Sequence, residues 1–481
     1  MYFSNLFFLY IFLPALFLAY FIVRNDTYRR IVLTAFSLFF YAFGEPVYVF
    51  LMIGLVAVDY GFGRVIGKTA EIRIRKRWLI AAVVLNLAFL CFFKYLGFFI
   101  ETWNTLFVLQ LPVFSLKMPI GISFFTFQTM SYVIDVYRGD AEVQKSYGRL
   151  LLYVSFFPQL IAGPIVRYKD IEAQLDNRHV ELSAFHEGLF RFCMGLAKKV
   201  LIADSCNTAV EQFFSLSDKT VAGQWLGAVF YTLQLYFDFS GYSDMAIGLG
   251  KMFGFTFFEN FNYPLISKNA TEFWRRWHIS LGTFFRDYVY IPLGGNRHDQ
   301  MRNIFVVWFL TGMWHGASWN FMIWGLYYGC LLVWEKTRLL PALHKGPDPA
   351  CHPHLAQLCT FGKSLFGHVY CTLITVFGFA IFYFDKHFFA NMGTLFGIGT
   401  IGFTDLFTNA IFASHIWLFI AAVILACPVY PAIDRLLHRE GHTIPYTAER
   451  IAKTVLVLLF LGVSTVQLVG NTYSPFLYFR F

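Results

Sequence analysis

The sequence has few charged residues: Asp, Glu, Lys and Arg make up only 14% of its 481 residues. A soluble globular domain carries about a quarter charged residues, so this composition excludes an ordinary soluble protein. The strict alternation of apolar and polar residues that marks transmembrane β-strands is missing as well. Hydrophobic residues instead form 57% of the chain, and phenylalanine alone contributes 60 residues. The composition therefore predicts an all-α, polytopic membrane protein.

Familiar catalytic and redox motifs are also missing. The eight cysteines form no CxxC pair and lie mostly in apolar segments, which is typical of small core residues rather than of a disulfide framework. No GxSxG, HExxH, Walker A or GxGxxG motif occurs. Cys351, His354 and Cys359 could hold a metal by ligand type, but an exposed loop explains them equally well. We therefore expect no metal and no bound cofactor.

The formal net charge of +9 comes from basic residues in short segments between apolar runs. Arg24, Arg29 and Arg30 follow the first apolar run, and residues 64–77 form the most basic segment. Such clusters follow the positive-inside rule, so they predict cytoplasmic loops, contact with membrane lipids and no nucleic-acid partner. We expect a multi-pass membrane protein with these basic loops on the cytoplasmic side and its N-terminus outside.

The apolar runs predict about ten or eleven transmembrane helices, since a span needs about 20 residues. No soluble domain or repeat interrupts them, so residues 1–481 are expected to form one transmembrane domain. Runs 118–139 and 158–168 are broken by Pro, Gly and polar residues, so they should line a cavity or be buried in protein. Other expected elements are an apolar hairpin (31–44 and 46–61), an amphipathic surface helix (185–204), a Pro/His-rich loop (339–363) and late spans near 373–384, 415–430 and 454–470.

The stretch from Thr271 to Gly325 contains His278 and His315 among tryptophans, arginines and glycines, whereas His298 lies in a polar turn and should be solvated. Ionisable side chains are costly at membrane depth, so their presence there indicates function. An imidazole titrates near neutrality and can take a proton from a sugar hydroxyl. His278 and His315 are therefore the candidate catalytic residues; the alternative is a core histidine bonded to a backbone carbonyl.

Residues beside these histidines are candidates for substrate binding. Trp314 offers a flat wall and Asn320 a polar group next to His315. Arg275 and Arg276 precede His278 and would suit anionic phosphates such as those of coenzyme A, although an interfacial anchor explains them equally well. If this segment is helical, Arg275 lies one turn before His278. The Arg286–Asp287 pair is interpreted as structural.

A polar cluster interrupts the apolar segment 234–250. Asp238, Ser240 and Tyr242 are further candidates for substrate binding, and Asp238 or Asp244 could orient a histidine. Hydrogen bonding between helices is the alternative.

Three long motifs carry a family resemblance: FDFSGYSDMAIGLG, ENFNYPLISKNATEFWRRWHISLGTFFRDYVYIPLGGNR and TGMWHGASWNFMIWG. They resemble the membrane-bound O-acyltransferase (MBOAT) superfamily, in the branch of bacterial alginate O-acetyltransferase AlgI and peptidoglycan O-acetyltransferase PatA. The resemblance covers nearly the whole chain. Phe284–Phe285 depart from it, because many relatives have Trp there.

The resemblance implies re-entrant and surface helices around a central tunnel, with His315 as the essential histidine and His278 as the second. It implies acetyl-CoA as donor and a polysaccharide acceptor such as alginate, peptidoglycan or another exopolysaccharide. An extracytoplasmic acetyltransferase partner with a Ser-His-Asp site would complete the transfer. D-alanyl transfer to teichoic acid and a glycan or lipid transporter without bond chemistry are the alternatives.

Overall fold

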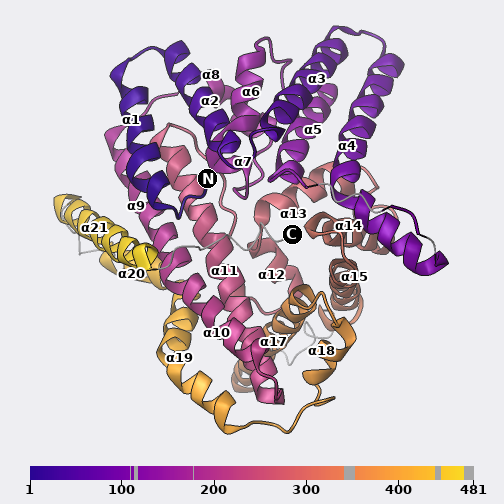
Figure 1. Cartoon of the computed structure of the whole chain (residues 1–481), viewed down its shortest axis with the longest axis vertical. Helices are drawn as coiled ribbons and strands as arrows, with labels where there is room; N and C mark the ends of the chain where they lie inside the picture. The colour runs from indigo at the N-terminus through magenta and orange to yellow at the C-terminus, as the bar shows by residue number, and fades with distance from the viewer. Residues whose placement is uncertain (109, 113–116, 177, 341–352, 439–445, 471–481) are drawn as a thin grey trace. The chain divides into compact units, whose positions relative to one another are not determined.

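The computed structural model describes residues 1–108, 110–112, 117–176, 178–340, 353–438 and 446–470 (Figure 1). These residues form helices and loops without a β-strand; one isolated bridge joins Thr220 and Gly402. The prediction of an all-α protein is confirmed. The chain divides into two compact units, which are Met1–Ala197 with Gly241–Glu259 and Leu456–Phe481, and Lys198–Ser240 with Asn260–Val455. One domain over residues 1–481 stays a prediction.

Five helical segments in the described part of the chain are long and apolar enough to cross a membrane: Tyr48–Lys68, Ile72–Phe107, Gln357–Tyr383, Leu406–Leu425 and Thr447–Gly470. A shorter apolar helical stretch covers Phe8–Ile22. The protein is thus a multi-pass membrane protein. Fewer helices qualify than the sequence predicts because several apolar runs form helices of only 16 or 17 residues: α2 (Asp26–Ala42), α5 (Ile122–Arg138), α14 (Gln300–His315) and α15 (Trp319–Trp334).

The first unit contains the predicted N-terminal hairpin, formed by α2 and α3 (Tyr48–Lys68). Helix α3 runs to Lys68 and α4 (Ile72–Phe107) begins at Ile72, so the basic segment 64–77 is mostly helical rather than a loop. The other helices of this unit are α1 (Leu13–Ile22), preceded by the π-helix Phe8–Phe12, and α6 (Tyr147–Ser155), α7 (Phe157–Leu160), α8 (Tyr168–Asp176) and α9 (Leu182–Ala197).

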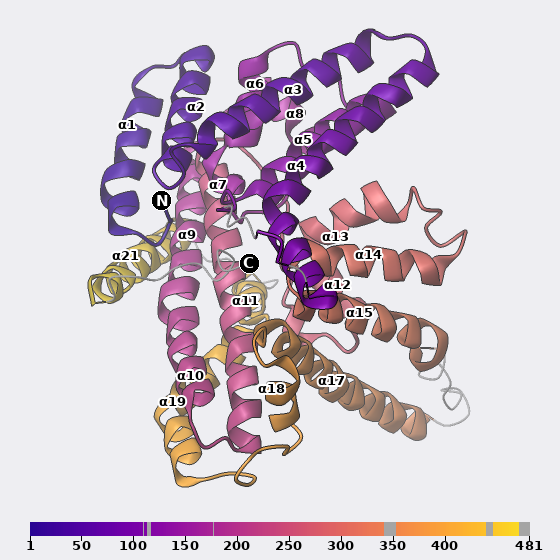
Figure 2. The ribbon, with the colours of Figure 1, turned by 45° about the vertical axis from the view of Figure 1, so that its right-hand side comes forward.

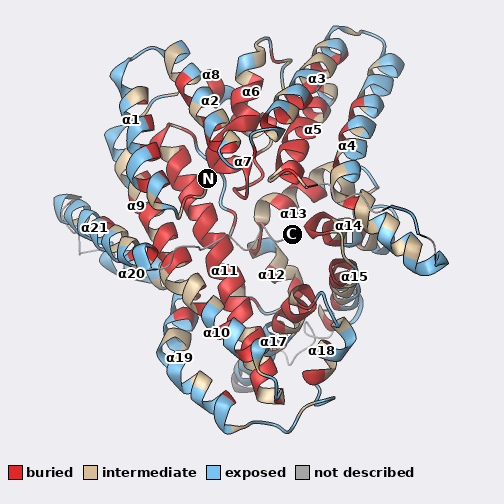
Figure 3. Cartoon of the chain, in the orientation of Figure 1, coloured by how far each residue is buried: buried red, intermediate tan, exposed pale blue. Residues whose placement is uncertain are grey.

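Helix α5 forms the core of this unit and is buried along most of its length (Figure 3). Its polar side chains bond inside the unit: the Thr129 hydroxyl donates to Asn86 at 3.1 Å, and Ser131 lies 3.2 Å from the Tyr153 hydroxyl. The helix begins after Gly121, whose φ of +75° suits glycine and where a Cβ would lie 2.8 Å from the Leu160 carbonyl oxygen. The predicted break is confirmed, and these polar residues are buried in protein.

The second unit contains the stretch 271–325. Its elements include the π-helix Lys198–Ala203, α10 (Asp204–Ser215), α12 (Ala270–Arg276), α13 (Ile279–Phe285), α17 (Pro353–Tyr383), α18 (Phe388–Thr394), α19 (Leu406–Leu425) and α20 (Val429–Leu437). Two helices are shared between the units. Helix α11 (Val221–Met252) belongs to the second unit up to Ser240 and to the first unit from Gly241, and α21 (Tyr446–Gly470) belongs to the second unit up to Val455 and to the first from Leu456. Helices α14, α15 and α17 lie side by side (Figure 2).

Three expectations from the sequence are wrong. Lys199 lies in the predicted surface helix but is buried, because its ammonium group is held by Asp204 at 2.7 Å and Asp238 at 2.8 Å. Cys91, Cys330 and Cys359 are exposed on helices rather than packed in a core. Helix α17 begins at Pro353, so residues 353–363 are helical rather than part of the predicted loop.

Close contact between α14 and α15 depends on two glycines. A Cβ on Gly312 would lie 2.4 Å from the Phe321 carbonyl oxygen, and one on Gly325 would lie 2.4 Å from the Trp308 carbonyl oxygen. Neither backbone oxygen can move aside without bending its helix. Because α14 ends at His315, this contact also fixes the position of that histidine.

We expect Gly312→Ala to lower the free energy of unfolding by about 1–3 kcal/mol, because the added methyl group overpacks the helix contact. The measurement is the thermal unfolding midpoint of the detergent-solubilised protein. Gly362→Ala is the matched control, since a Cβ there meets nothing within 4 Å. Equal midpoints for the two variants would contradict the packing argument.

Candidate functional site

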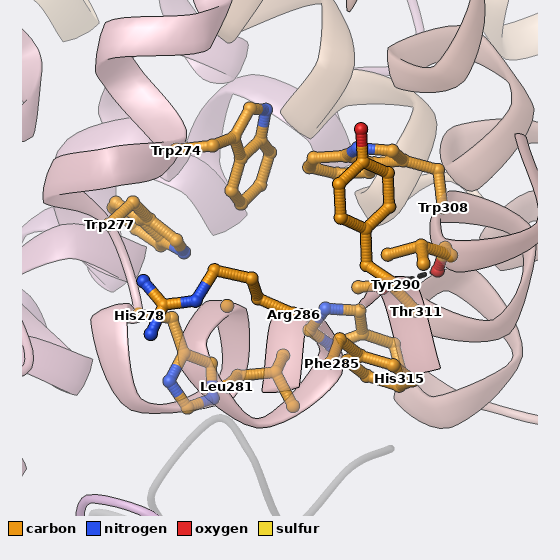
Figure 4. A pocket seen from close by; sticks show the side chains of 12 residues that line it. Trp274, Trp277, His278, Leu281, Phe285, Arg286, Tyr290, Trp308, Thr311 and His315 are labelled. Atoms are coloured by element: carbon orange, nitrogen blue, oxygen red, sulfur yellow. Dashed lines mark hydrogen bonds between the residues drawn. The ribbon is translucent and has the colours of Figure 1, made fainter. Parts of the chain in front are cut away.

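His278 and His315 line the same pocket, a cavity of about 160 Å³ in the second unit (Figure 4). Both side chains are buried, with 2% and 7% of their surface exposed. The cavity is bounded by α12, α13, the π-helix Arg286–Tyr290 and α14. Its other lining residues are Trp274, Trp277, Leu281, Gly282, Phe285, Arg286, Tyr290, Val307, Trp308 and Thr311. The two histidines predicted from the sequence are thus brought together.

Helix α12 carries the chain to His278 and is anchored at its start. The Asn269 side chain caps it by accepting from the backbone amide of Glu272 at 2.7 Å. The buried Glu335 carboxylate accepts from the amides of Ala270 at 2.6 Å and Thr271 at 2.9 Å. These bonds satisfy three of the four amides that a helix start leaves without partners. The anchor makes the end of α12 a fixed point from which His278 is placed.

The chain leaves helical geometry between α12 and α13. Trp277 is extended, and His278 has φ +45° and ψ +53°, in the left-handed region. A non-glycine residue there costs about 1–3 kcal/mol, and such strain is concentrated at functional sites. Arg275 and His278 are therefore not neighbours on one helical turn, contrary to the helical interpretation of this segment.

Asn260 orients the His278 ring. Its Oδ1 accepts from the Ser280 backbone amide at 3.2 Å and from the Ser280 hydroxyl at 2.9 Å, and it lies 3.2 Å from His278 Nδ1. A backbone amide only donates, so the atom facing it must be the amide oxygen of Asn260. Nδ1 then carries the proton that is donated to Asn260, which leaves the lone pair on Nε2. The sequence analysis missed Asn260.

His315 is the last residue of α14, and Gly316 follows in extended conformation. Its ring packs edge-on against Trp324 and Phe382, with ring centroids 4.9 and 5.0 Å apart. A Cβ on Gly316 would lie 2.3 Å from the Phe321 ring, so only glycine lets the chain turn here. The carbonyl end of a helix favours a positive charge, which assists an imidazole that takes up a proton.

Three indole rings, those of Trp274, Trp277 and Trp308, line the cavity. Trp274 meets Trp308 at 4.7 Å and Trp324 at 5.3 Å between ring centroids. Trp314 bridges the two histidines, at 5.7 Å from the His278 ring and 4.9 Å from the His315 ring. Large aromatic side chains keep water away from a reacting group. Trp314, the tryptophan predicted to wall the site, packs against both histidine rings but is not among the residues that line the cavity, so substrate binding by Trp314 stays a prediction.

Arg286 is a pocket residue that the sequence analysis interpreted as structural. Its Nε donates to Asp287 at 2.7 Å, as predicted, but its side chain is 60% exposed and lines the cavity. Figure 4 shows the guanidinium group on the side of Trp277 and His278. Its position depends on the π-helix that starts at Arg286, a feature that no sequence signal marked. A cation here can bind the anionic part of a substrate.

The other predicted binding residues near the histidines lie outside the cavity lining. Arg276 pairs with Glu272 at 2.9 Å, one turn back on α12, and Arg275 is exposed. Asn320 is buried and donates to the Phe382 carbonyl at 3.0 Å, so it joins α15 to α17. Substrate binding by these residues stays a prediction.

The polar cluster of α11 is divided between the two units. Asp238 pairs with Lys199 and Ser240 is buried in the second unit, whereas Tyr242 is buried in the first, stacked on Phe3 at 4.7 Å. Asp244 accepts from Arg191 at 2.9 Å. Substrate contacts by Asp238, Ser240 and Tyr242 stay predictions.

Among the described residues, the cavity lining includes neither the third histidine of the stretch 271–325 nor a set of metal ligands. His298 is exposed, as predicted. The described residues contain no group of three His, Cys, Asp or Glu side chains placed to hold a metal ion. The metal alternative at Cys351 and His354 lies outside the residues whose side chains the structure describes.

The fold and the pocket define a multi-pass membrane protein in which two histidines line one aromatic cavity. The chain belongs to the membrane-bound O-acyltransferase family, whose model matches residues 83–339, a range that includes both histidines. It is therefore an acyltransferase, and the predicted family is confirmed.

Relatives extend the match to the whole chain. The probable alginate O-acetylase AlgI of Azotobacter vinelandii is 39% identical over an alignment of 507 residues. The alignment covers 100% of this chain and 100% of that relative. A peptidoglycan O-acetyltransferase of Helicobacter pylori is 39% identical over 68% of both chains. A teichoic acid D-alanyltransferase of Bacillus subtilis is 31% identical over 46% of this chain and 60% of its own.

Asn260→Ala should lower acyl transfer by about ten- to a hundredfold, because the His278 ring loses the bond that sets its orientation and tautomer. Asn260→Asp keeps the acceptor and adds a charge that favours imidazolium, so it should restore part of the activity and shift the acidic limb of the pH profile upward. The measurement is the initial rate against pH.

Asn262→Ala is the matched control, since the Asn262 contacts to Arg276 involve its backbone. If Asn260 were only structural, Asn260→Ala would still lower the rate, but the pH profile of Asn260→Asp would match that of the wild type. An unshifted pH profile in Asn260→Asp would therefore contradict the orienting role.

Proposed function

We propose that this protein takes acetyl from a cytoplasmic thioester, acetyl-CoA, and passes it across the inner membrane for O-acetylation of a cell-surface polysaccharide. The observation that carries the proposal is the pair of buried histidines on one aromatic cavity. The names of the relatives support it, since alginate and peptidoglycan are both polysaccharides that carry hydroxyl groups.

The proposed chemistry needs one base and one electrophile. His315 takes the proton of an acceptor hydroxyl, whose oxygen attacks the thioester carbonyl carbon. The C–O bond forms, the C–S bond breaks, and the thiolate leaves and takes up the proton from the imidazolium of His315. His278, held with its lone pair on Nε2, accepts a hydrogen bond and keeps the reacting groups aligned.

Two features of the cavity suit a short acyl group on a charged carrier. Its volume of about 160 Å³ suits an acetyl group with the end of its thioester arm, whereas a long acyl chain needs a longer tunnel. The exposed cation of Arg286 suits the phosphates or carbonyl oxygens of the carrier. The indole walls protect the thioester from hydrolysis.

Delivery to the polymer is proposed to require a second protein. The chain has no motif for a Ser-His-Asp site, so the serine of an extracytoplasmic acetyltransferase with such a site would supply the hydroxyl that accepts acetyl in this cavity and would then pass it to the polymer. The basic segments after the first apolar run and at residues 64–77 support a cytoplasmic donor side.

Donor choice separates the proposal from D-alanyl transfer, which the Bacillus subtilis relative favours. Purified protein in liposomes that enclose the extracytoplasmic acceptor protein should release free thiol from acetyl-CoA and leave a D-alanyl carrier-protein thioester intact. The measurement is thiol release with each donor in turn, with His315→Ala as control. Consumption of the D-alanyl thioester alone would overturn acetyl transfer and support the alternative.

A further inference from the structure

A cluster of three arginines lies in the first unit, and none of the three lines the histidine pocket. Arg29 and Arg30 are the fourth and fifth residues of α2, and Arg178 follows α8. Tyr20, Arg30 and Asp26 are the electrostatic neighbours of Arg178. Segments about 150 residues apart in the sequence thus bring three guanidinium groups to one place, with one carboxylate beside them.

Aromatic rings hold two of these arginines in fixed positions. The Arg29 guanidinium carbon lies 5.1 Å from the centre of the Tyr20 ring, and that of Arg178 lies 4.5 Å from the centre of the Phe255 ring. Both are stacking contacts that a delocalised guanidinium makes well. The loop that carries Arg178 rests on Gly254, where a Cβ would lie 3.5 Å from the Arg178 Cβ. The groups are therefore ordered before any ligand arrives.

The charges of this cluster are not balanced within the described part of the chain. Arg29, Arg30 and Arg178 form no ion pair there, and the Nε–H groups of Arg29 and Arg178 are buried and reach no acceptor. Partly burying a guanidinium group without an opposite charge costs free energy. An anion from outside the chain would offset that cost, and the planar groups suit the paired oxygens of a phosphate.

The exposed apolar side of α1, which would face lipid, ends next to the arginine cluster. Leu18 and Ile22, in the last turns of α1, are 74% and 76% exposed, and Arg24 follows two residues later. An apolar exposed helix that ends in arginines is typical of the boundary between acyl chains and headgroups, where basic residues attract anionic lipids. We propose that Arg29, Arg30 and Arg178 bind a phosphate group, supplied by an anionic phospholipid of the membrane leaflet at this end of α1.

The test measures the binding of phosphatidylglycerol to the full-length, delipidated protein. Binding is detected by native mass spectrometry and by the shift of the thermal unfolding midpoint. Arg29→Gln with Arg178→Gln should weaken phosphatidylglycerol binding about tenfold or more, because two charge-assisted contacts are lost. Arg73→Gln with Lys76→Gln is the matched control, since it removes the same charge from exposed positions of α4. It should leave binding within about twofold of the wild type.

Inorganic phosphate and coenzyme A, each added in phosphatidylcholine nanodiscs, distinguish the source of the phosphate. If they raise the midpoint of the wild type but not of the double variant, the site binds phosphate and the lipid source is overturned. If the double variant does not fold, Arg30→Gln alone is measured and should weaken binding as well. Equal binding by the arginine variants and the α4 control would overturn the site. None of these readouts depends on acyl transfer.

Discussion

His315→Ala is expected to abolish polymer acetylation, with a loss of about 10²–10⁴-fold in the transfer rate, because the proposed mechanism uses this imidazole as the general base. The ring is buried at the end of α14 and lines the cavity, so no other group in that helix end can replace it. The measurement is the acetyl content of the cell-surface polysaccharide in cells that carry only the variant.

Two controls separate chemistry from folding in this experiment. His298→Ala removes an exposed histidine from the same stretch and should leave acetylation unchanged. His315→Gln retains much of the side-chain volume against Trp324 and Phe382, so it should keep the unfolding midpoint near that of the wild type while activity is lost. Normal acetylation by a well-inserted His315→Ala protein would contradict the assignment.

His278→Ala is expected to lower the transfer rate by about a hundredfold, less than the loss at His315, because it removes an aligning group rather than the base. The residue occupies a strained backbone conformation that alanine also finds unfavourable, so the midpoint of unfolding should change little. The measurement is the rate with saturating donor.

A His278→Gly variant tests whether backbone strain contributes. Glycine adopts φ +45° without cost, so this variant should be at least as stable as the alanine variant and equally inactive. Activity retained by the glycine variant would mean that the imidazole is dispensable and would contradict its role in alignment.

Much of the architecture follows from local sequence signals. Long apolar runs predict the helices, and the Gly44–Pro46 turn predicts the α2–α3 hairpin, because these signals act within a few residues. The break before α5 could be predicted from Pro119 and Gly121 for the same reason. Both histidines could be selected as candidate catalytic residues, because an ionisable side chain at membrane depth is costly and usually marks a functional site.

Features that depend on distant contacts could not be predicted. The left-handed turn at His278 relies on Asn260, 18 residues away, and nothing in the segment 271–285 marks it. Burial of Lys199 requires Asp238 from α11, which supplies an opposite charge inside the second unit. Arg286 reaches the cavity because a π-helix turns it there, whereas its sequence neighbours indicate only a local pair with Asp287.

In the proposed mechanism, the two histidines of one cavity cleave an acetyl thioester and pass the acetyl group on. The most direct test is the rate of thiol release from acetyl-CoA by protein reconstituted in liposomes that enclose the extracytoplasmic acceptor protein, for the wild type and for His278→Ala with His315→Ala. We predict steady release by the wild type and a loss of at least about a hundredfold in the double variant. Equal release by both proteins, or movement of glycan by a wild type that cleaves no thioester, would contradict the account.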